Sequence, residues 1–110
     1  AHVLTRIREL SQHYGLAVAN VFHAGDGNLH PLILFDASIE GQLDQAEALG
    51  GDILTLCVDV GGTITGEHGV GLAKKPFLPA AVGPVSMDVM RRLKHDFDPA
   101  GILNPGKIFD

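Results

Sequence analysis

Apolar residues recur at helical spacing in the opening stretch of the chain. Val3, Ile7, Leu10 and Tyr14 are separated by three or four positions, so they share one face of a helix. Gly15 follows directly, and glycine is the residue type that most often terminates a helix. The pattern predicts an amphipathic helix that begins with the chain and stops before Gly15.

Two apolar runs, residues 16–23 and 29–35, flank the polar, glycine-rich segment 25–28. Runs of this kind around a short turn predict an antiparallel hairpin. Pro31 has no N–H group, so we expect it at a sheet edge or at the start of its strand. A two-stranded hairpin is marginal in water, so helices must cover it or further strands must pair with it. An open edge would favour self-association.

Helical spacing returns after the hairpin, with Asp36 or Ser38 expected to cap the helix. Its apolar positions are Leu43, Ala46, Leu49, Ile53, Leu56 and Val60. The glycine pair at 50–51 should weaken the middle of this helix, and a second glycine pair at 61–62 should end it.

Proline residues limit where helices can form in the C-terminal third of the chain. Pro76 and Pro79 allow only a short helix, whereas Pro84 is well placed to start the last long one. One face of that helix carries Val85, Val89, Leu93 and Phe97. The turn-rich tail at 98–107 should pack as an ordered loop. Its neighbourhood contains four apolar residues that need burial, namely Ile102, Leu103, Ile108 and Phe109. The predicted fold class is α+β, an antiparallel hairpin packed with three to four helices.

Composition narrows the functional classes. The chain has 110 residues, 45% of them hydrophobic, and a formal net charge of −5, which argues against binding nucleic acid. The basic run at 91–94 is interpreted as a solvated helix face.

The lone Cys57 lies in an apolar stretch and is expected to be a buried small hydrophobe in a reducing compartment. No membrane span or signal pattern is found, which indicates a cytoplasmic location. Because the chain starts at Ala1 inside a helical pattern, we expect it to be an excised part of a longer one.

Histidines lie within two glycine-rich segments of the chain and are candidate metal ligands. His23 and His30 flank the turn, so the hairpin can bring their imidazoles together, and a second glycine cluster offers Glu67 beside His68. Two imidazoles and a carboxylate suit zinc or manganese. Three protein ligands also leave positions open, as a catalytic metal site requires.

The same residues allow other interpretations. A histidine at a strand end is usually a surface residue, and Glu67 could merely complement a helix dipole. Asp26 could be a turn residue, or it could orient a histidine. Two further functions stay open on this ground: a metal-dependent hydrolase in which His68 or Asp26 activates water, and a non-catalytic assembly module whose glycines serve only as turns.

Three segments resemble signatures of one family. Residues 23–31 resemble the HxGDGNxH signature of FAD-linked oxidases of the vanillyl-alcohol-oxidase superfamily, in the branch of the glycolate oxidase FAD-linked subunit and D-lactate dehydrogenase. The segment 61–71 with Lys74 is similar to a second signature of that branch, and 98–107 to its C-terminal one. Their order along the chain is the expected one.

The resemblance implies specific roles. His23, His30 and Glu67 would hold a divalent metal, zinc or manganese, which binds the carboxylate and 2-hydroxyl of a small 2-hydroxy acid. His68 would be the base that takes the hydroxyl proton while hydride passes to the flavin. Leu32 stands where the hydroxyglutarate branch often has Asn, which favours glycolate or D-lactate as substrate.

The resemblance also places the chain in a larger enzyme. Residues 1–110 would be the C-terminal part of the substrate (cap) domain, a fragment of a ferredoxin-like fold that lacks the FAD-binding domain. Asn28, Asn104 and Lys107 would reach FAD, which the missing domain mainly binds, and the chain alone would be inactive. Its partners would be that domain and other oxidase subunits, through which it could associate with a membrane.

Overall fold

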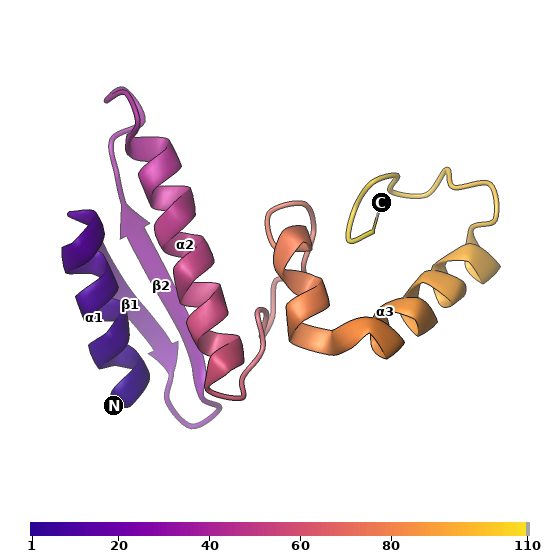
Figure 1. Cartoon of the computed structure of the whole chain (residues 1–110), viewed down its shortest axis with the longest axis horizontal. Helices are drawn as coiled ribbons and strands as arrows, with labels where there is room; N and C mark the ends of the chain where they lie inside the picture. The colour runs from indigo at the N-terminus through magenta and orange to yellow at the C-terminus, as the bar shows by residue number, and fades with distance from the viewer. Residues whose placement is uncertain (110) are drawn as a thin grey trace. The chain divides into compact units, whose positions relative to one another are not determined.

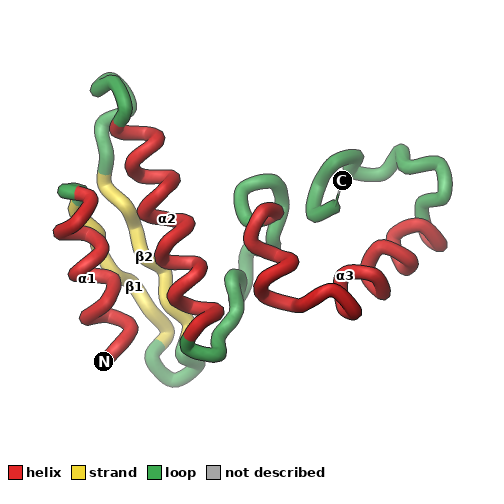
Figure 2. Tube along the Cα trace, in the orientation of Figure 1, coloured by secondary structure: helices red, strands yellow, loops and turns green. Residues whose placement is uncertain are grey.

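The computed structural model describes residues 1–109, which fall into two compact units, residues 1–60 and 61–109. The elements, in order, are α1 (His2–Tyr14), β1 (Ala17–His23), β2 (Asn28–Leu34), α2 (Gln42–Asp59), the 3-10 helix Lys75–Phe77 and α3 (Leu78–Phe97) (Figures 1 and 2). Three α-helices and one antiparallel two-stranded sheet confirm the predicted α+β class. Within the described part of the chain, none of the helices has the length and apolar character needed to cross a membrane.

The first unit is a hairpin covered by two helices. β1 and β2 pair from Ala17 opposite Leu34 to His23 opposite Asn28. Successive side chains of a strand point to opposite faces, so one face carries Val18 and Ile33, which pack against the core. That core comprises Ile7, Leu16, Ala46, Leu49 and Ile53, contributed by α1, the residue before β1, and α2. Both helices therefore cover the same face of the sheet.

The ends of the two helices in this unit follow different rules. α1 stops as predicted at Gly15, whose φ of 67° and N–H contacts to the carbonyls of Ser11 and Gln12 form a left-handed cap. The predicted side-chain cap of α2 is wrong: its N-cap is Gly41, with no side-chain hydrogen bond. Asp36 lies too far upstream, and its carboxylate accepts hydrogen bonds from the backbone N–H and hydroxyl of Ser38 instead.

α2 runs through both glycines at 50–51 and ends at Asp59, just before the glycine pair at 61–62, as expected. Gly50 lies over the sheet, where a Cβ atom would be 3.7 Å from Ile33 Cδ1. Burial of the apolar face of α2 thus outweighs the poor helix propensity of two glycines. Cys57 is half-buried against this core, and burial raises the pKa of its thiol, which agrees with its predicted role as a small hydrophobe.

The second unit contains a broken helix. α3 includes Gly83, whose φ of 79° and ψ of 168° are not helical. A short helical stretch therefore precedes Gly83, and the long one starts at Pro84, as the prolines predict.

Burial in the second unit departs from prediction. Its buried side chains include Ile64, Leu78 and Met87. Ile102 and Leu103 are 74% and 56% exposed, so their expected burial is wrong, whereas Ile108 and Phe109 are half-buried. The apolar face of α3 is exposed as well, at Val85, Val89, Leu93 and Phe97. Polar contacts, rather than apolar packing, hold the tail to the helix.

Asp98 provides most of these polar contacts. Its buried carboxylate accepts hydrogen bonds from the backbone N–H groups of Ile102 and Leu103, each at 3.0 Å, and from Lys94 Nζ. Lys94 also donates to the carbonyl of Leu103 at 2.6 Å. The hydrogen bond from Lys94 lowers the pKa of the Asp98 carboxyl, and the two backbone donors add to this shift.

Because the folded-state pKa of Asp98 is lowered, its contribution to stability should be fully present above its unfolded-state pKa of about 3.9 and lost as the pH falls through the folded value. Asp98→Asn should therefore lower the urea midpoint at neutral pH, and the difference from the unmodified chain should shrink in acid. Asp96→Asn, at an exposed position of the same helix, is the matched control. A midpoint difference that is unchanged between neutral pH and acid would contradict this role.

Candidate metal site on the hairpin

The open face of the sheet carries the signature histidines. His23 pairs with Asn28, and His30 pairs with Val21. Counting from the helix-covered pair of Val18 and Ile33, both histidines fall on the opposite face. They occupy diagonal positions at the turn end of the hairpin, which are close enough for long side chains to meet.

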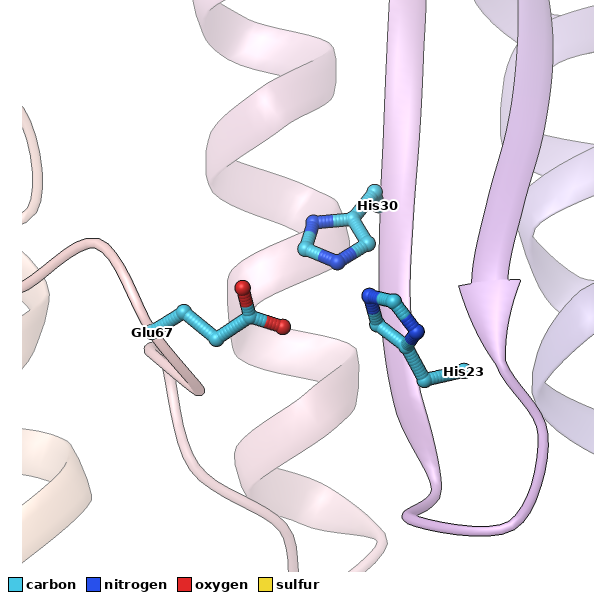
Figure 3. A group of neighbouring side chains, drawn as sticks. All are labelled: His23, His30 and Glu67. Atoms are coloured by element: carbon cyan, nitrogen blue, oxygen red, sulfur yellow. The ribbon is translucent and has the colours of Figure 1, made fainter.

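The two imidazoles do meet, as the hairpin predicts. Their ring centroids are 5.3 Å apart, and the rings are nearly perpendicular, at 84° (Figure 3). His23 is exposed and His30 half-buried. Each neutral imidazole has one nitrogen able to act as a metal ligand, so the pair presents two nitrogen donors from neighbouring strands.

The turn fixes the spacing of the pair. Residues 24–27 form the connection between the strands, and Gly27 has a φ of 67°, which side-chain-bearing residues rarely adopt. The N–H group of Asp26 donates to the carbonyl of His23 at 3.1 Å. Asp26 is therefore a turn residue, one of the two roles considered for it.

Glu67 and His68 belong to the second unit. Both are exposed in the loop between α2 and the 3-10 helix that begins at Lys75. Because Glu67 is not in the first turn of a helix, its interpretation as a partner of a helix dipole is wrong. Ile64, in the same loop, is buried, at 4% exposure. The hydroxyl oxygen of Thr65 is buried and makes no hydrogen bond within residues 1–109.

His23 and His30 of the first unit offer imidazole nitrogens and Glu67 of the second unit offers a carboxylate oxygen, donor types that could hold a metal ion. Two nitrogen donors and one carboxylate oxygen fit zinc or manganese by the chemistry of the donor set, and the group contains no thiolate. His23, His30 and Glu67 are the three residues expected as ligands from the sequence.

The predicted flavin-side residues lie in both units. Asn28 is half-buried at the start of β2. Asn104 and Lys107 are exposed in the tail and line a surface pocket beside α3. Asn104 has a φ of 47°, a conformation that asparagine tolerates better than most residues.

Sequence reasoning missed the role of Asp98 in ordering this tail. The available signal was the spacing of Lys94 and Asp98, which places opposite charges one helical turn apart.

Together, the fold and the site define an α+β protein that carries a pair of histidines beside a glycine-rich turn. Residues 1–108 match the family of FAD linked oxidases, C-terminal domain, and the chain belongs to this family. The predicted resemblance to FAD-linked oxidoreductases related to glycolate oxidase and D-lactate dehydrogenase is thereby confirmed.

Curated relatives match along nearly the whole chain. The glycolate oxidase subunit GlcD of Escherichia coli K12 is 56% identical over 105 residues, 96% of this chain and 21% of its own length. GlcD of Bacillus subtilis is 39% identical over 99% of this chain and 23% of its own. The mitochondrial D-lactate dehydrogenase [cytochrome] of Arabidopsis thaliana is 38% identical over 98% of this chain and 19% of its own. The chain thus spans about a fifth of the length of these relatives.

Proposed function

We propose that this chain is the metal-carrying C-terminal part of a flavoenzyme that oxidises a small 2-hydroxy acid, glycolate or D-lactate, to the 2-oxo acid. The observation that carries the proposal is the imidazole pair of His23 and His30 on the open face of the hairpin. Relatives that are named for glycolate oxidase and D-lactate dehydrogenase support the choice of substrate class.

Glu67 is the third ligand in this proposal. A carboxylate oxygen beside two imidazole nitrogens completes a donor set that zinc and manganese accept, which supports the assignment. Three protein ligands leave coordination positions for the substrate carboxylate and 2-hydroxyl.

When bound, the divalent ion supplies a Lewis acid at the 2-hydroxyl, and FAD supplies the acceptor for the hydride of C2. The chain supplies the base: a ring nitrogen of His68 takes the hydroxyl proton as the hydride leaves, which gives the 2-oxo acid. An imidazole is suited to this step because it exchanges protons near neutral pH. Its place directly after Glu67 keeps the base next to a metal ligand.

The surface around the histidines suits a small substrate. Leu32, 51% exposed, shares the open face with His30, and Val21, 54% exposed, lies directly opposite His30. Their apolar side chains would leave a second carboxylate without a partner, which favours glycolate or D-lactate over a dicarboxylic acid.

Other parts of the enzyme complete the cofactor site. Asn28, Asn104 and Lys107 are proposed to approach the flavin, while a separate FAD-binding domain holds most of it, and the isolated chain is inactive. The name of the Escherichia coli relative, a subunit, supports further oxidase subunits as partners, which would bring a cytoplasmic protein to a membrane. Self-association of the isolated chain through the open sheet edges is also proposed.

The role of His68 can be tested in the flavin-containing protein that carries this chain. Anaerobic mixing with glycolate or D-lactate should bleach the flavin, and His68→Gln should slow the reduction by about 10²–10⁴-fold while metal content stays unchanged. His13→Gln, an exposed histidine of α1, is the matched control. Failure of every small 2-hydroxy acid to reduce the flavin would refute the proposed function.

A further inference from the structure

We propose that the second unit has a binding site for a phosphate group, in the pocket between α3 and the tail. Four cationic or imidazole side chains line this pocket: Arg91, Lys94 and His95 from α3, and Lys107 from the tail. Two residues of the basic run at 91–94, Arg91 and Lys94, line the pocket. The site does not depend on the metal ligands, but it shares Asn104 and Lys107 with the residues proposed above to approach the flavin.

The pocket has a fixed wall, because the tail is tied to the rest of the unit on both sides of Lys107. On one side, Lys75 Nζ donates to the carbonyl of Gly106 at 3.1 Å. On the other side, the N–H of Ile108 donates to the carbonyl of Gly71 at 3.0 Å. Asp98 fixes the earlier part of the tail through Ile102 and Leu103, as described above. A preorganised wall reduces the entropy that a ligand must lose on binding.

The charges in the pocket do not cancel. Asp98 is the acidic residue among those that line it, and its carboxylate is already engaged by Lys94 and two backbone N–H groups. Within the described residues, Arg91 has no acidic partner, and Lys107 donates to the carbonyl of Pro105 at 3.4 Å. The net charge of the chain is −5, so this concentration of positive charge is local.

The negative end of the α3 dipole does not remove this positive charge. Arg91 lies six residues before the end of the helix at Phe97, whereas the dipole acts mainly within the last turn. Lys94 and His95 occupy that region and offset the negative end.

The chemistry of the lining selects a phosphate group. A guanidinium presents a fork of N–H donors that matches two phosphate oxygens, and a lysine ammonium adds a point charge. Asn104 contributes an amide donor at the same pocket. Phe109, half-buried at the pocket, provides an aromatic surface against which a nucleotide base could stack. A free phosphate ion and the phosphate of a nucleotide both present the group that this pocket would recognise.

The test is a titration of the full chain with inorganic phosphate at constant ionic strength, followed by calorimetry. We expect saturable binding that Arg91→Gln and Lys107→Gln each weaken by about tenfold or more, because each variant removes a charge-assisted hydrogen bond. Arg92→Gln is the matched control: it is adjacent, carries the same charge, and pairs with Asp88 at 2.6 Å on the helix surface.

Adenosine monophosphate distinguishes the two ligand sources. Tighter binding than inorganic phosphate, lost in Phe109→Leu, would support the site and assign it to a nucleotide; equal binding would support it as a site for free phosphate. Absence of saturable binding by either ligand, or equal weakening in Arg92→Gln, would overturn the proposal. Circular dichroism of each variant separates loss of binding from loss of fold, and an intact metal site alongside a negative result would leave the proposed function standing.

Discussion

Replacing Glu67 by alanine is expected to lower the affinity of the chain for zinc by roughly 100-fold or more, and His23→Ala should have a similar effect. The proposed site has three protein ligands, so each variant would remove a direct ligand, and even changes in residues that only orient a ligand cost about 10–100-fold. Competition with a chromophoric chelator measures the affinity of each variant directly.

His13→Ala is the control for these variants, because His13 is an exposed histidine of α1 outside the metal group. It should retain the affinity of the unmodified chain. Equal zinc affinity in Glu67→Ala, His23→Ala and the unmodified chain would show that these side chains do not form a site, and would favour the alternative in which the glycine clusters are only turns.

The second large effect concerns the core of the first unit. Leu49 is fully buried between α1, α2 and the sheet, at 0% exposure. Leu49→Ala should lower the free energy of unfolding by about 2–5 kcal/mol, since the variant loses buried apolar surface and leaves a cavity in a close-packed core. Urea denaturation followed by circular dichroism measures this change.

Leu43→Ala provides the matched control on the same helix. Leu43 is 47% exposed, so removing its side chain should change the free energy of unfolding by less than about 1 kcal/mol. If the two variants were equally stable, the helix-covered hairpin would not be the stabilising core of this unit.

Local patterns predicted the elements of this chain well, because each has a direct physical cause. The spacing of Val3 and Ile7 and the stop at Gly15 define α1, and two apolar runs around a glycine turn define the hairpin. Pro84 predicts the start of the long stretch of α3, which the break at Gly83 confirms. In each case, neighbours in the sequence determine the backbone conformation.

Features that depend on distant partners were predicted less well. The cap of α2 falls on Gly41 rather than on Asp36 or Ser38, because the chain after the hairpin makes its own turn before the helix begins. Burial of Ile102 and Leu103 was inferred from their apolar character alone, but in this unit backbone contacts to Asp98 order that segment.

The candidate site also divides into a part that local patterns predict and a part that depends on a distant residue. The approach of His23 and His30 follows from hairpin geometry, because both fall on one face near the turn. Glu67 lies in another part of the sequence, with no shared secondary structure; its place beside His68 in the second glycine cluster made it a candidate, and the resemblance to FAD-linked oxidases strengthened that choice. Family membership over residues 1–108 supports that resemblance and favours an oxidase over the alternative of a hydrolase.

The most direct test of the account is the X-ray absorption spectrum of the chain after zinc loading and dialysis, with the zinc content measured on the same sample. We predict about one zinc ion per chain, with nitrogen and oxygen ligands near 2.0–2.2 Å, two of them imidazoles. Glu67→Ala should lose this zinc. No retained zinc, or zinc bound through sulfur at about 2.3 Å, would contradict the assignment of His23, His30 and Glu67 as the metal site.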